Sequence, residues 1–194
     1  DNGDFSGVTS FNGGAGTDSL TFRNLTGALA GGTVSGMENV TIGSGGTVSV
    51  SGTLDTDTVT VTNGGTLGGT GTINANVTVD ASSTLGPGNS PGLLSIVGNL
   101  DLGVSSITLL ELGGTAAGTE YDVIDVANDP ATDPTIEGIA TLAAGAILDI
   151  DFFGGFDAAL GDVFDVLIAD TINGDINSLS FDFTNALLAA GLEW

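Results

Sequence analysis

Small apolar residues alternate with Thr and Ser along much of the first hundred residues. Clear examples are residues 47–50, 59–61 and 77–79, where Val occupies every second position. Successive side chains of a β-strand point to opposite faces, so this alternation is typical of strands with one buried face. No stretch of this region combines helical spacing with helix caps. The pattern therefore predicts an all-β region of short strands.

A short phrase, Gly-Thr followed by an aliphatic residue, recurs through the same region. Starts of the phrase lie 14, 6, 13, 6 and 12 residues apart, so that two phrases and a gap give a period of 19 to 20 residues. A repeat of about 20 residues made of strands and Gly turns is one coil of a solenoid, which buries its apolar side only by stacking on its neighbours. The phrases begin at Gly32, Gly46, Gly52, Gly65, Gly71 and, in a looser form, Ser83.

The chain changes character near a turn-forming segment at residues 86–92, which holds two prolines and three glycines. We expect Gly/Thr-rich solenoid repeats over 1–92. Residues 93–194 carry longer, more apolar strands with Asp at alternate positions. They are expected to continue the parallel β-solenoid with wider coils. A β-sandwich is the alternative for 93–194, because these strands are less repetitive.

The charge balance restricts what the chain can do. One basic residue, Arg23, stands against 24 acidic residues, the formal net charge is -23, and His and Cys are absent. Catalytic pairs that need a His base cannot form, and zinc sites built from His and Cys cannot form. Nucleic acids and anionic lipids are bound through Lys and Arg, so neither is an expected partner. No apolar run reaches the roughly 18 residues of a membrane span, so this segment is not expected to insert into a membrane.

Residues 13–22 fit a calcium-binding nonapeptide pattern, in which turn carbonyls and an Asp carboxylate supply oxygen ligands. The pattern makes Asp18 the candidate calcium ligand. Calcium is the one cofactor that the sequence suggests. Such ions are normally shared between successive repeats, and one clear copy is present here. The alternative interpretation is a Gly-rich corner that begins a coil.

Acidic residues of the second half form two further candidate groups. One comprises Asp122, Asp125, Asp129 and Asp133, and the other comprises Asp149 and Asp151 on one strand face. Paired carboxylates can hydrolyse glycosides when they lie about 5 to 10 Å apart. However, the chain has one Trp and one Tyr to form a sugar platform. A solvated acidic face is therefore favoured over cation binding and over catalysis, and the chain is not expected to be an enzyme.

Four segments resemble the β-strand repeats of autotransporter passenger domains and of related bacterial surface proteins. They are residues 67–73, 86–92, 110–115 and 121–126, with the sequences LGGTGTI, GPGNSPG, LELGGT and YDVIDV. The resemblance covers roughly residues 10 to 194. It implies a right-handed parallel β-helix on the outer surface of a bacterial cell. It implies little chemistry, since such folds host many functions.

A secreted structural or adhesive β-solenoid is thus the expected function, with the chain itself as its main partner. Exposed end coils join neighbours by strand addition or stacking, which predicts head-to-tail association into a filament or matrix. Surface glycans are a further expected partner. The alternatives are a carbohydrate-active β-helix that uses paired Asp carboxylates and a passive stalk that presents another domain.

Overall fold

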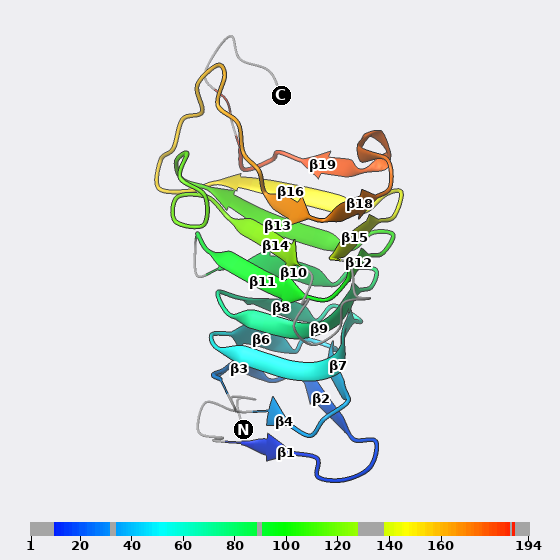
Figure 1. Ribbon diagram of the computed structural model, residues 1–194. Helices are drawn as coiled ribbons and strands as arrows, with labels where there is room; N and C mark the ends of the chain where they lie inside the picture. Colours follow the sequence, from blue (N-terminus) through cyan, green and yellow to red (C-terminus); the bar gives the residue numbers. More distant parts are fainter. Residues whose placement is uncertain (1–9, 32–33, 89–90, 128–137, 187, 189–194) are drawn as a thin grey trace.

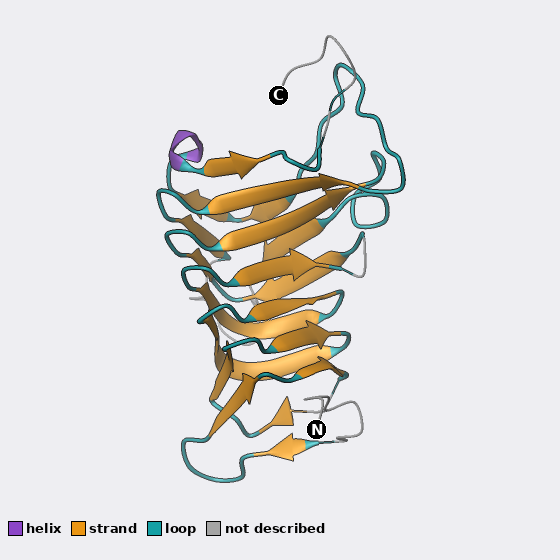
Figure 2. Cartoon of the chain, turned by 180° about the vertical axis from the view of Figure 1, so that it is seen from behind, coloured by secondary structure: helices purple, strands orange, loops and turns teal. Residues whose placement is uncertain are grey.

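The chain forms a stack of parallel β-strands in the computed structural model, which describes residues 10–31, 34–88, 91–127, 138–186 and 188 (Figure 1). All of the strand-to-strand ladders are parallel. The one helical element among the described residues is a 3-10 turn, η1, at Ile176–Ser178 (Figure 2). The predicted all-β parallel fold is confirmed, and its right-handedness stays a prediction.

Three ladders run along the stack, and one passage of the chain through all three is called a coil below. The first face contains β2 (Ser19–Arg23), β5 (Asn39–Gly43), the second half of β7 (Thr53–Thr62), the second half of β9 (Thr72–Val79), β12 (Leu100–Leu102), β15 (Ile139–Leu142) and β18 (Thr171–Asn173). The second face contains β3 (Thr26–Leu29), β6 (Thr47–Val50), β8 (Thr66–Gly69), β10 (Thr84–Pro87), β13 (Ile107–Leu112), β16 (Ile147–Phe152) and β19 (Ser180–Asp182).

The third face contains the first halves of β7 and β9, then β11 (Leu93–Val97), β14 (Val123–Ala127) and β17 (Leu167–Ala169). A separate pair, β1 (Phe11–Asn12) with β4 (Val34–Ser35), lies at the N-terminal end of the stack (Figure 1). β7 and β9 each serve two faces because their pairing shifts register between Asp55 and Thr58.

The spacing of the strands agrees with the predicted repeat in the first half. Thr47 pairs with Thr66, and Thr66 pairs with Thr84, which are separations of 19 and 18 residues. The next partners of Thr84 along the second face are Ile107 and then Ile147, so the later coils are longer. Strands from both sides of residue 92 join the same ladders. The β-sandwich alternative for 93–194 is wrong, because sandwiches are built from antiparallel sheets and these strands pair in parallel.

The core is a set of columns of inward-facing side chains, one residue from each coil. On the first face, Val59, Val77, Leu100 and Ala140 are each at most 1% exposed. The alternate residues of the same strands, such as Thr60 and Thr78, lie at the half-buried outer surface. The Val/Thr alternation in the sequence is therefore the inside/outside alternation of the strands.

One corner of each coil, between the first and second faces, uses a left-handed backbone conformation. The residues there with positive φ include Ser44, Asn63, Ser82 and Ser105, with φ between 40° and 62°, and then Gly145. Backbone hydrogen bonds join successive corners, from the Ser82 amide to the Ser105 carbonyl and from the Ser105 amide to the Gly145 carbonyl. The repeated turn keeps both faces in register from coil to coil.

Candidate functional site

Asp18, the predicted calcium ligand, lies just before β2 in the first coil. Its backbone amide donates a 2.6 Å hydrogen bond to a carboxylate oxygen of Glu38. Its own Oδ2 atom is buried and has no hydrogen-bond partner among the described residues. A cation would satisfy this oxygen. Glu38, which the sequence did not single out, is the second carboxylate at this corner.

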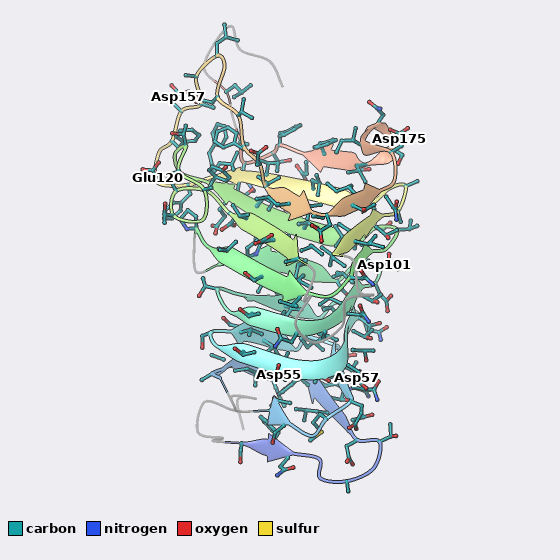
Figure 3. All side chains as sticks on the ribbon, viewed as in Figure 1. Asp55, Asp57, Asp101, Glu120, Asp157 and Asp175 are labelled. Carbon is teal, nitrogen blue, oxygen red and sulfur yellow. The ribbon has the colours of Figure 1, made fainter. Side chains whose placement is uncertain are left out.

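Larger clusters of metal-binding carboxylates are absent from the described residues, the Asp18 corner included. Within the described residues, no three acidic side chains are grouped so that they could hold a metal ion. Asp125 lies on β14 in the third face, away from the second-face residues Asp149 and Asp151, and Asp129 and Asp133 lie outside the described residues. Labelled acids such as Asp55, Asp101 and Asp157 are exposed and spread over different coils (Figure 3).

Asp149 and Asp151 do share the outer face of β16, as expected from the sequence. Asp149 is opposite Asp182 on β19, and Asp151 accepts a 2.9 Å hydrogen bond from the Asn185 side chain. Partial burial, and then the charges of Asp151 and Asp182, raise the pKa of Asp149. This is a repulsive acidic face rather than an arranged catalytic pair.

Asp122 is a buried structural joint. Its carboxylate accepts hydrogen bonds from the Gly92 amide at 2.6 Å and from the Glu111 amide at 2.9 Å, so both oxygens are engaged. Its backbone amide donates to the Glu111 carbonyl, and the amide of Val123 donates to the Gly92 carbonyl. Three of the segments that carried the family resemblance therefore meet at one carboxylate. Burial raises its pKa to about 6 despite the two amide donors.

The surface beside this joint does not resemble a sugar-binding cleft. A depression of about 300 Å³ is lined by Glu111 and Asp122 together with small residues of β6, β8 and β10, and no aromatic side chain lines it. Asp122 is 1% exposed and fully hydrogen-bonded to backbone amides. The arrangement favours a role in holding Gly92, directly before β11, against β13 over a role in acid-base chemistry.

The last coil differs from the middle coils because inward-facing residues on two of its three strands are exposed to solvent, while Leu167 and Ala169 on β17 stay half-buried. Ile172 continues the column of Leu100 and Ala140 but is 50% exposed, whereas those two are fully buried. Phe181 continues the column of Leu85, Thr108 and Leu148 and is 46% exposed. No described strand pairs with the outer edges of β17, β18 and β19. We call these three strands and η1 the terminal coil.

Apolar exposure is concentrated around this end. Of nine exposed large hydrophobic side chains among the described residues, seven lie between residues 153 and 181. Some belong to the terminal coil and others to the long loop that projects beyond β16 (Figure 1). The seven are Phe153, Leu160, Val163, Ile168, Ile172, Ile176 and Phe181.

A cavity of about 530 Å³ opens inside the last coils. Leu110, Leu142, Leu148 and other aliphatic residues form most of its lining. Part of the cavity is open because residue 174 is a glycine and has no side chain to cover Leu142. A Cβ at this position would meet the backbone of Leu142. The sequence analysis missed this cavity. Its available signals were a polar residue at an inward position of β13 and a glycine, Gly174, directly after β18.

Comparisons of the chain with protein-family models, with curated proteins and with solved structures find no match. Within the described parts of the chain, no helix has the length and hydropathy needed to cross a membrane.

Proposed function

We propose that this chain is an extracellular structural or adhesive module, which joins other copies of itself end to end through the terminal coil. The observation that carries the proposal is the exposure of Ile172 and Phe181, whose counterparts in earlier coils are covered by the next coil. A second copy stacked on this end would bury them and would pair the free edges of β17, β18 and β19.

The first coil of a second copy is the occupant that fits this end best. It offers β2 and β3, which are the first strands of the first and second ladders and lie near the β1–β4 pair at the opposite end of the stack (Figure 1). Stacking β2 on β18 and β3 on β19 would extend both ladders in the same parallel sense. Head-to-tail contacts of this kind are heterologous, so they generate filaments when they do not close into rings.

The net charge of -23 opposes this association, so cations are part of the proposal. Dissolved salt or calcium outside a cell would screen the repulsion. Calcium bound at Asp18, with Glu38 beside it, would also neutralise charge in the coil that must contact the terminal coil. The unpartnered Oδ2 atom of Asp18 supports this assignment. Titration calorimetry should show calcium binding that Asp18→Asn removes, whereas equal binding by the two proteins would contradict it.

Sedimentation velocity and electron microscopy test the association directly. The protein should form concentration-dependent oligomers or filaments in calcium or high salt and fewer in EDTA at low salt. Ile172→Asp should abolish them. The matched control Thr141→Asp adds the same charge at an exposed outward position of β15 and should leave association intact. A monomer under all conditions would refute the proposal and favour the passive stalk.

A further inference from the structure

We infer that the cavity beneath the terminal coil is a binding site for a small neutral amphiphile, namely an aliphatic molecule that carries a hydroxyl group. The cavity shares Ile172 and Ile176 with the end surface proposed for association, but its ligand is a small molecule rather than a second copy of the chain. The cavity reaches into the interior of the last coils, and ligand binding can be tested on the monomer.

The size and lining of the cavity suit such a ligand. Its volume of about 530 Å³ lies within the range of small-molecule sites, which are mostly apolar with a few placed polar groups. Empty apolar cavities stay dry but accept apolar molecules. Side chains from all three faces line it, so it is a feature of the folded stack and not of one loop. Among them are Leu102, Leu110, Ile124, Leu142 and Leu148.

Thr108 supplies the polar contact. It lies on β13 at an inward position, between Leu85 in the coil below and Leu148 in the coil above, and it lines the cavity. It is 2% exposed, and its hydroxyl has no hydrogen-bond partner among the described residues. A buried hydroxyl without a partner is costly, and a ligand hydroxyl would remove that cost. The same column holds Leu at Leu67 and Leu85, so the fold does not require a polar residue there.

The negative charge around the cavity disfavours ligands that carry a carboxylate. Asp165 and Asp175 are exposed and complete the lining. Hydrogen bonds from the backbone and side chain of Asn177 lower the pKa of Asp175, so it is ionised at neutral pH. A fatty carboxylate would meet these two carboxylates and the net charge of -23. An uncharged alcohol meets no such repulsion.

The test uses monomeric protein, at concentrations where sedimentation shows no association, and three ligands of one chain length. 1-Octanol should bind by calorimetry and raise the melting temperature, and octanoate should bind at least about tenfold more weakly because its charge must be desolvated beside carboxylates. Tighter binding of octylamine, unaffected by changes at Thr108, would show that the rim carboxylates select the ligand and would overturn the assignment.

Variants at Thr108 locate the site. Thr108→Val keeps the shape, removes the hydroxyl, and should weaken octanol binding by about three- to tenfold, which is the worth of one hydrogen bond. Thr108→Leu removes the hydroxyl and narrows the cavity, so it should weaken binding more than Thr108→Val does, and Val166→Phe at the cavity wall should also weaken binding. The control Thr60→Val lies in a middle coil and should bind like the unaltered chain. Unchanged binding in Thr108→Leu and Val166→Phe, or no octanol binding by the unaltered protein, would refute the inference.

Discussion

The middle coils and the terminal coil place the same kinds of residue at inward-facing positions, yet the surroundings of these residues differ. Ile73 lies between Leu54 and Ile96 and is fully buried, while Ile172 has Ala140 on one side and is half exposed. Burial in this fold is supplied by neighbours along the stack rather than by the coil itself. The contribution of a side chain to stability therefore depends on its position along the stack more than on its type.

The largest expected effect follows directly from this difference. Ile73→Ala should lower the free energy of unfolding by about 3 kcal/mol, since it leaves a cavity between two covered neighbours. Ile172→Ala should cost less than about 1 kcal/mol in the monomer, because half of the side chain is already in water. Urea unfolding followed by circular dichroism measures both. Equal losses would mean that the terminal coil is as well covered as the middle.

The pH dependence of stability should come next in size and should depend on Asp122. Its folded pKa of about 6 exceeds the value of 3.8 for an unperturbed Asp, so the folded chain holds this proton more tightly. The free energy of unfolding is therefore higher in acid and falls as the pH rises from about 4 to above 6. Between pH 5 and pH 7 the loss should be about 1 kcal/mol.

Asp122→Asn isolates this contribution. The variant should be less stable overall, because its amide group faces one of the two backbone donors, from Gly92 or Glu111. Its stability should nevertheless change less between pH 5 and pH 7 than that of the unaltered chain. Measurements should stay above the isoelectric point of about 4.1 to avoid precipitation. Identical slopes for the two proteins would exclude Asp122 as the titrating group.

A smaller change, an increase in stability, is expected at the left-handed corner. Ser105 has a φ of 60°, which disfavours residues with a Cβ, so Ser105→Gly should raise stability by about 0.5 kcal/mol. The matched change Ser95→Gly, in the extended strand β11, should instead lower stability by a similar amount. Thermal melts of the two variants should shift in opposite directions. A shift in the same direction would show that the corner is not strained.

The smallest effect concerns the acidic face near the terminal coil. Asp149→Asn should raise stability by a few tenths of a kcal/mol at low salt, since it removes repulsion from Asp151 and Asp182. The gain should vanish at about 1 M salt, where such interactions are screened. Asp101→Asn, at an exposed position of β12 in an earlier coil, is the control. A gain that survives high salt would point to packing instead of charge.

The repeat in the sequence predicted the first half of the fold well. The Thr of successive Gly-Thr phrases begins β6, β7, β8 and β9, and the looser phrase begins β10. This works because each short strand carries its own inside/outside alternation and each turn its own glycines, so local pattern and final structure agree. The parallel pairing followed from the period, since like residues one coil apart become neighbours.

Neither the Asp122 joint nor the cavity could be predicted in this way. The carboxylate of Asp122 bonds residues 30 and 11 positions away, and the intervening coil lengths follow no fixed period. Similarly, Thr108 looked like one more strand Thr until the register placed it between Leu85 and Leu148. Asp18 was found by its motif, while Glu38 joins it through the pairing of separate coils.

The left-handed corner also determines where this chain can lengthen. From the end of a first-face strand to the start of the next second-face strand, the connection stays short throughout, from Gly43 to Thr47 and later from Leu142 to Ile147. The connection that follows the second face instead grows, and β16 ends at Phe152 while β17 begins at Leu167. The connection between the first and second faces thus stays short, whereas the connection after the second face can hold inserted residues. Foreign segments grafted there could be displayed in a regular array without disturbing the ladders.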